Sequence, residues 1–418
     1  MLEVEFLLFQ IRSGCLLLLL LPLVMLLLQH PWCCPLLATR RLGWLLPLPV
    51  FARRFSTAVA SQWPGLPAWR ASPLNHNRYW GLQGPAPLPI DSSLPSGTPP
   101  IGSLEGPHAT KPEARCLAEW GALVLETADP SSKAVLTHQA FQLWCQGKMP
   151  IGFGKAPDMP ARPVKPELVH PRKIPHPKAS ALPPNAHMLH NLAHIELNAI
   201  DLAWDTVVRF SYASSQLGTQ FFADFAHVAD DESRHLCWCL QRLSELGFRY
   251  GDMPAHNLLW RDCHKTSEHV DARLAIIPMV QEARGLDAGP RLVERLIGLD
   301  DNRSAGIVQC ISEEEVAHVA VGVSWFYRVC SQQGIEPSLR FKDLMISNGV
   351  TLKGPFNYAA RTMAGIPRDW YDASVQDGYS MSIVGSLPST NEMVHAIPSQ
   401  VHERLAQIIV AESKNNET

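Results

Sequence analysis

Two Glu-x-x-His steps, far apart in the sequence, constrain this chain more than any other feature. They are Glu232–His235 and Glu315–His318. In a helix, residues three positions apart share a face, because each residue turns the chain by about 100°. Both pairs lie among apolar residues at helical spacing, so all four side chains are expected to point into a core. Burying such ionisable groups is costly unless they are paired or coordinate a metal.

The sequence around these motifs predicts a bundle of four long helices. Helical periodicity begins at residue 186 and lasts to about residue 334, without strand alternation or hairpin signals. A Gly- and Pro-containing crossover at 247–260 separates the two halves. The predicted fold class is all-α, a four-helix bundle with additional N- and C-terminal helices and a Pro-rich extended segment. The four predicted helices span about 186–211, 217–246, 266–286 and 302–331.

Each of the other two helices offers one inward carboxylate. Glu196 projects from within the apolar arc of the first helix, where an unpaired carboxylate would cost several kcal/mol. Glu282 lies on the apolar face of the third helix, with Asp287 as the fallback. Pro278 is expected to kink this helix, so the facing argument is looser there. The chain therefore presents its carboxylates and histidines in the order Glu, Glu-x-x-His, Glu, Glu-x-x-His.

Several other ionisable residues fall off the inner faces by the same helical geometry. The histidines of the first helix lie opposite Glu196, which predicts a polar face or a helix contact for them. Glu313 and Glu314 are expected to point toward solvent or to flank the motif. The residues assigned in this way to positions outside the inner site are His187, His190, His194, Asp230, Asp231, Arg234, Glu313 and Glu314.

The order of carboxylates and histidines matches the ligand set of dinuclear carboxylate proteins. The competing interpretation is an ordinary bundle with buried Glu–His and Glu–Arg ion pairs. The chain resembles the ferritin-like superfamily, and specifically an uncharacterised branch known as a domain of unknown function, over roughly residues 114–376. The motifs that carry the resemblance are HIELNAIDLAWD (194–205), FADFAHVADDESRHL (222–236), YGDMPAHNLLW (250–260), EARGLD (282–287), EEEVAHVAVGVSW (313–325) and KGPFN (353–357).

The resemblance implies a site for two Fe or Mn ions. Its ligands are expected to be Glu196, Glu232, His235, Glu282, Glu315 and His318. Asp230–Asp231 departs mildly from the Glu- or Ala-rich sequence usual beside the second motif. Five further residues are candidates to orient ligands, cap an access channel or pair with a ligand carboxylate, with plain turn and helix-end roles as the alternative. They are Tyr250, Asp252, His256, Arg284 and Asp287.

A ligand set of this kind does not fix the reaction, because function depends on the pocket around it. Well over half of the chain lies outside the four helices, which favours an enzyme with an unknown organic substrate over an iron-storage shell. We expect an O₂-dependent di-iron monooxygenase. The alternatives are a ferroxidase or peroxide-handling protein, and a non-catalytic helical bundle that binds RNA or protein.

The sequence says less about the binding partners of the protein than about its metal ligands. No nucleotide or flavin fingerprint is present, so a separate reductase is expected. A net charge of −3 gives no general signal for nucleic-acid binding. The scattered cysteines lack paired spacing, which is typical of reduced thiols. A homodimer stays open.

The N-terminal region has a different composition from the rest. Residues 37–60 are Arg-rich and acid-free, typical of a mitochondrial or plastid transit peptide. The apolar run 15–28 is the competing signal-peptide core or membrane anchor, but it is short for a membrane span. We expect mitochondrial localisation. The predicted organisation is a targeting segment at 1–60, a Pro/Gly-rich linker at 61–112, a ferritin-like domain at 113–376 with its core bundle at 186–334, and a tail at 377–418.

Overall fold

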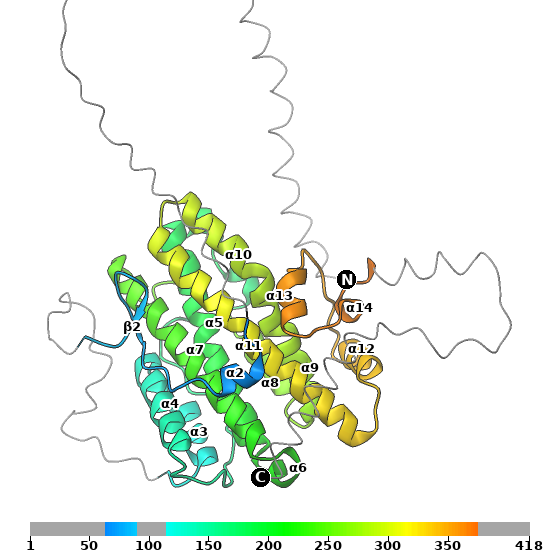
Figure 1. Ribbon diagram of the computed structural model, residues 1–418. Coiled ribbons are helices and arrows are strands. Elements are labelled where there is room, and N and C mark those ends of the chain that lie inside the picture. The colour runs from blue at the N-terminus through cyan, green and yellow to red at the C-terminus, as the bar shows by residue number, and fades with distance from the viewer. Residues whose placement is uncertain (1–62, 90–113, 375–418) are drawn as a thin grey trace, which may run out of the picture. The chain divides into compact units, whose positions relative to one another are not determined.

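A computed structural model describes residues 63–89 and 114–374 (Figure 1). These residues belong to one unit of the chain, Val59–Thr418. The predicted targeting segment at 1–60, with the apolar run 15–28, and the predicted tail at 377–418 lie outside the described residues. Within the described ranges, none of the helices combines the length and the apolar character needed to cross a membrane.

Long helices dominate the described residues, so the all-α prediction is confirmed. The three longest are α5 (Pro184–Arg209), α7 (Thr219–Glu245) and α11 (Asn302–Gln333). Local signals set their ends. Proline occupies the first turn of α5, where the missing N–H costs nothing. Asp301 caps α11 by accepting from the Ser304 amide, and α11 ends at Gly334, which has a left-handed backbone.

The third helix differs from its prediction. It comprises α9 (Val270–Ile276), the π-helical segment η4 (Ile277–Glu282) and α10 (Ala283–Gly298). Because Pro278 has no N–H to donate, the helix widens into a π-helical turn at this point and does not end there. The predicted end near residue 286 was wrong, because α10 continues through Pro290 and packs against α11.

The long helices pack in two pairs. α5 lies along α7, and α10 lies along α11, which also contacts α9, η4 and α7 (Figure 1). Two shorter helices cover the first pair, α3 (Leu117–Glu126) on α5 and α4 (Pro130–Cys145) on α7. α5 is thereby enclosed, and every residue from Glu196 to Val208 is buried.

Residues 63–89, which we call the N-terminal strap, differ from the predicted linker. The strap contains α2 (Leu66–Arg70) and two antiparallel two-residue strands, β1 (Tyr79–Trp80) and β2 (Pro85–Ala86). Arg70 forms an ion pair with Asp224 on α7, at 2.6 Å. The Trp80 amide donates to Gln241 further along the same helix. The contacts that attach the strap to α7 are made by isolated polar side chains that follow no periodic pattern. Periodicity in the sequence therefore could not identify them.

The remaining segments complete the cover. The Pro-rich stretch before α5 is extended, with two short turns, η1 (Pro171–Lys173) and η2 (Pro177–Ala179), and one bridge between Leu168 and Ala255. Short helices fill the other connections and follow α11. They are η3 (Ser211–Ala213), α6 (Ser214–Leu217), α8 (Leu258–Lys265), α12 (Pro337–Ser347), α13 (Tyr358–Met363) and α14 (Arg368–Tyr371).

Gly322 sets how closely α11 approaches η4. A Cβ at Gly322 would overlap the ring carbons Cβ and Cγ of Pro278. We expect Gly322→Ala to lower the free energy of unfolding by about 1–3 kcal/mol, because overpacking forces backbone shifts. Gly285→Ala in α10 is the matched control, since no heavy atom lies within 4 Å of its Cβ position. Helix propensity alone should stabilise that variant by up to about 1 kcal/mol.

Urea unfolding of the metal-free protein checks this expectation. A Gly322→Ala midpoint equal to or above that of the unmodified protein would show that the close approach is not required.

Candidate metal centre

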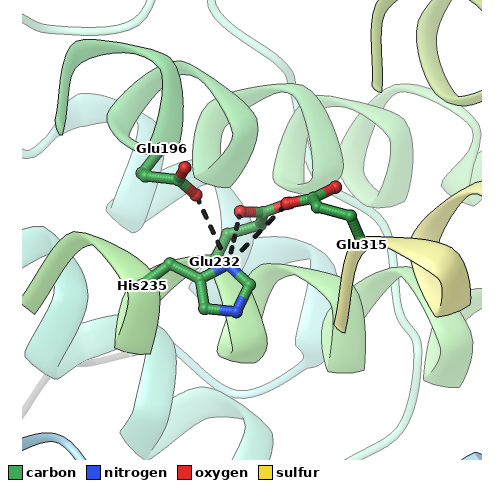
Figure 2. A group of neighbouring side chains, drawn as sticks. All are labelled: Glu196, Glu232, His235 and Glu315. Carbon is green, nitrogen blue, oxygen red and sulfur yellow. Dashed lines mark hydrogen bonds and ion pairs between the residues drawn. The ribbon is translucent and has the colours of Figure 1, made fainter. Parts of the chain in front are cut away.

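Four buried side chains from three helices converge on one point. Each of Glu196 on α5, Glu232 and His235 on α7, and Glu315 on α11 offers a ligand atom, and these atoms lie within 4.8 Å of one another. Figure 2 shows the three carboxylates directed at one ring nitrogen, His235 Nδ1. This nitrogen is 3.4 Å from Glu196, 3.3 Å from Glu232 and 3.8 Å from Glu315. The helical-face argument therefore places these four residues correctly in space.

His318 extends this group to a second half. Its Nδ1 lies 2.9 Å from Glu232 Oε1 and 3.4 Å from Glu315 Oε2. The other oxygen of each glutamate faces His235. Glu232 and Glu315 thus stand between the two histidines, and Glu196 lies at the His235 end. Carboxylates shared in this way are the natural bridges between two cations.

Glu282 lies at the His318 end. It is the last residue of η4 and is partly buried. Burial raises the pKa of its carboxyl to about 8, and the charges of His318, Glu232 and Glu315 act on it. It is not one of the four residues in the tight group. The wider turn that Pro278 induces therefore ends at this carboxylate.

The pKa values within the cluster shift in two directions: those of Glu196, Glu315 and both histidines rise, and that of Glu232 falls. Burial and the neighbouring Glu232 charge raise the pKa of Glu196 and Glu315. Burial opposes charging of both histidines, but the surrounding carboxylates outweigh it and raise the pKa of His235 and His318 well above the ordinary value. The pKa of Glu232 is lowered despite burial, because both histidines contact it. Protons on the two histidines thus supply the positive charge that balances ionised Glu232.

The donor set fits a metal better than it fits its own hydrogen bonding. Three buried atoms of the cluster form ion pairs at 2.9 to 3.4 Å but lack a hydrogen-bond partner in favourable geometry among the described residues: Glu196 Oε2, Glu232 Oε1 and His318 Nδ1. Unsatisfied buried polar atoms are rare and costly. All three face the space between the helices where the other donors converge. Carboxylate oxygen and imidazole nitrogen suit iron, manganese and zinc alike.

Two outer carboxylates, Asp231 and Glu314, contact the histidines from behind. His235 Nε2 lies 2.7 Å from Glu314, and His318 Nε2 lies 3.4 Å from Asp231. Each histidine is thus held by the acid on the opposite helix, which leaves its Nδ1 free to face the cluster. Arg234, also buried, hydrogen-bonds both acids.

The prediction that Glu314 points to solvent or merely flanks the motif was therefore wrong, and Asp231 and Arg234 were missed. The signal that could have found them is an acid directly before each Glu-x-x-His. This position lies about 100° from the inner face, which directs it toward the neighbouring helix. Glu313 is exposed as expected and bonds Gln309.

The five residues predicted to support the ligands lie elsewhere. Tyr250 and the His256 carbonyl contact His194, on the side of α5 away from Glu196, at 2.7 and 2.8 Å. Asp252 caps its own turn by accepting from the Arg249 amide.

Asp287 forms a buried bidentate pair with Arg361, so its charge is already compensated and it is no substitute for Glu282. Arg284 is exposed and bonds Gln281.

The α5 histidines stay outside the cluster, as predicted, and they lie on a buried polar face of α5. His190 accepts from the Gly251 amide, and His194 bonds the crossover as described above. Desolvation lowers the pKa of both imidazoles to about 4, so they are neutral at pH 7. Their role is to satisfy the polar crossover against α5.

Fold and cluster together define a helical protein with a buried carboxylate–histidine group able to hold metal. Comparison with known proteins assigns the chain to a family. The family described as "Protein of unknown function (DUF455)" matches residues 126–372, and the chain belongs to this family. An "Uncharacterized protein" of Haemophilus influenzae is 34% identical over 263 residues, which cover 59% of this chain and 90% of the relative. No solved structure matches.

The outer carboxylates provide a test of how the histidines are held. Asp231→Asn and Glu314→Gln keep shape but remove the charge behind each imidazole. We expect either change to weaken metal affinity by about 10–100-fold while leaving the number of bound ions unchanged at saturation. Competition with a chelator of known affinity measures this, with Glu313→Gln as the exposed control. Affinity unchanged in both variants would show that these contacts only stabilise the fold.

The pKa values predict how the metal-free protein responds to pH. Groups whose pKa is raised by folding stabilise the fold at low pH and lose that contribution as pH approaches the folded value. For Glu282 this window runs from the ordinary 4.5 to about 8. For His235 and His318 it opens above 6.5. Glu232 acts oppositely, but its contribution is lost only below 4.5.

We therefore expect the Tm of chelator-treated protein to fall between about pH 6 and pH 9. The increase in Tm caused by Fe²⁺ should grow over the same range, because metal displaces these protons. Calorimetry under anaerobic conditions measures both, and Glu282→Gln should flatten the metal-free curve. A metal-free Tm that rises with pH would contradict the assigned directions.

Proposed function

We propose that this protein is a dinuclear-metal oxidoreductase of the ferritin-like type, using two iron ions and O₂ as a monooxygenase. The observation that carries the proposal is the pair of Glu-x-x-His motifs whose glutamates lie between two histidines. In the proposal, α5, α7, the α9–η4–α10 segment and α11 are the four helices of a ferritin-like bundle. The packing of α5 on α7 and of α10 on α11 supports this arrangement.

The proposed ligands divide between two ions. Glu196 and His235 would hold one ion, and Glu282 and His318 the other, with Glu232 and Glu315 between them. Glu282 lies nearer solvent than the other carboxylates and would shift most easily as the charge of the centre changes. When bound, a pair of irons supplies the electrons and coordination positions that O₂ reduction requires.

The surroundings of the cluster favour chemistry on an enclosed substrate. Glu196, Glu232, His235 and His318 are at most 2% exposed. Such burial excludes bulk water and strengthens electrostatic interactions inside the site. A separate reductase would supply electrons, and the Arg-rich N-terminal composition supports an organelle address. The substrate is an organic molecule of unassigned class.

Metal stoichiometry tests the proposal first. The full chain, purified without a metal-affinity tag, is loaded anaerobically with Fe²⁺ and desalted before Fe, Mn and Zn are measured. We expect about two Fe per chain, retained in Glu313→Gln and lost in Glu315→Gln. These variants alter neighbouring glutamates of one helix, of which only Glu315 faces the cluster.

Exposure of the loaded protein to O₂ separates the remaining functions. Uptake that stops after the bound iron is oxidised fits an enzyme awaiting its substrate. Continued uptake with each addition of Fe²⁺ would favour the ferroxidase alternative. Absence of stoichiometric metal in folded protein would reject the enzyme and leave a binding bundle with buried ion pairs.

A further inference from the structure

A further pair of histidines lies outside the buried cluster, where the strap meets α4. Nδ1 of His76 in the strap lies 3.0 Å from Nε2 of His138 on α4. The two rings meet almost at a right angle, with centroids 5.0 Å apart and planes inclined by 89°. Neither histidine belongs to the tight group of ligand atoms in the candidate centre.

A carboxylate on a third segment fixes the tautomer of His138. Nδ1 of His138 lies 2.9 Å from Oδ1 of Asp230 on α7. Asp230 also forms an ion pair with Arg78 of the strap. An ionised carboxylate can only accept a hydrogen bond, so Nδ1 of neutral His138 carries the proton and Nε2 presents its lone pair toward His76. Histidines that bind metals commonly donate their other ring N–H to a carboxylate in this way.

The spacing of the two facing nitrogens suits a shared metal ion. Zinc–imidazole bonds are about 2.0–2.1 Å long, so two nitrogens on a tetrahedral zinc lie about 3.3–3.4 Å apart. The 3.0 Å between His76 and His138 is within a few tenths of an ångström of this separation. His76 is exposed, so its ring can move by that amount without disturbing the core. Without an ion, the same approach is one hydrogen bond between the imidazoles.

The two imidazoles also select the kind of ion. Imidazole nitrogen suits zinc, nickel and copper, whereas magnesium and calcium prefer oxygen ligands. Among the residues that the structure describes, no third His, Cys, Asp or Glu side chain completes a ligand group with His76 and His138. Because His76 is exposed, water can fill the remaining coordination positions. The site therefore differs from the buried, carboxylate-rich centre in both ligands and access.

We propose that His76 and His138 together bind one Zn²⁺ or a related late transition-metal ion, and that Asp230 positions His138 for this role. The ion bridges the strap and α4. The family match begins at residue 126, so His138 and Asp230 lie within it and His76 lies outside. The inference does not depend on the proposed function, because neither histidine contacts the candidate centre.

The bridge gives the strap a metal-dependent attachment. The strap contacts described so far reach α7, and Trp69 adds another by donating from Nε1 to Asp231 at 3.1 Å. His76 connects the strap to a different helix. Residues 71–77, which follow α2, are exposed or partly exposed. An ion at His76 therefore restrains a stretch of the strap that the core does not enclose.

Zinc counting tests the site. The full chain is dialysed to equilibrium against buffered free Zn²⁺, and bound zinc is measured per chain. The variants are His76→Asn, His138→Gln, the two combined, and the control His264→Gln, which alters an exposed histidine on α8. Zinc in the buried cluster is common to all of these proteins, so differences report the new site. We expect each single variant and the combined variant to lose the same one ion, and the control to lose none.

Two further measurements locate the ion and its effect. Nitrogen NMR of protein carrying isotope-labelled histidine should show zinc-dependent shifts of His138 Nε2 and His76 Nδ1. Zn²⁺ should also slow hydrogen exchange in peptides covering residues 71–77 at least several-fold in the unmodified protein. This slowing should be absent in His76→Asn, whose side chain is exposed in the native strap and is not needed for folding of the core.

The competing role for the two histidines is a hydrogen bond that holds the strap without metal. An unchanged zinc count in either single variant, or separate losses that add in the combined variant, would overturn the inference. Equal zinc-dependent slowing of the strap in His76→Asn would also overturn it. None of these results bears on the proposed function, which is tested by the iron content of Glu315→Gln.

Discussion

The repulsion among buried carboxylates is the constraint on which the rest of the structure depends. Glu196, Glu232, Glu282 and Glu315 face one another, with Asp231 and Glu314 immediately outside. With all six ionised and both histidines neutral, Arg234 leaves five negative charges. One divalent ion would still leave three, whereas two ions leave one. Without metal, burial in the first place and the neighbouring carboxylate charges in the second raise the pKa values of Glu196, Glu282 and Glu315, so that protons perform this compensation.

Helical geometry carried most of what could be predicted from the sequence. The facing of Glu196, Glu232, His235 and Glu315 follows from about 100° per residue and the apolar neighbours of each residue. What could not be predicted depends on contacts between elements. Helical periodicity gives the direction in which a side chain points, but not which segment covers that side of the helix. His194 and Asp201, which point away from the cluster, are therefore buried against other segments without any sequence signal for this. Asp201, for example, is enclosed by Lys133 and Arg162, which lie far from it in sequence.

The third helix shows a different limit. A proline in a periodic segment predicts an interruption, but the chain can break, kink or widen there. The outcome depends on the neighbour: Gly322 leaves room for Pro278 against α11, so the axis continues through a π-helical turn. Helix propensity, which depends on residue type, does not include this contact between two helices. The same wide turn determines where Glu282 stands relative to His318, so a packing detail of α11 positions a candidate ligand.

The strap links the site to a part of the chain that carries no helical pattern. α7 presents Glu232 and His235 inward, while Asp224, Asp231 and Gln241 hold the strap. One helix thus serves two surfaces, and Asp231 belongs to both. Any movement of Trp69 would change the hydrogen bonding of Asp231, and through it the charge felt by His318. Because an uncompensated charge in such a buried site is expensive, the strap and the centre cannot vary independently.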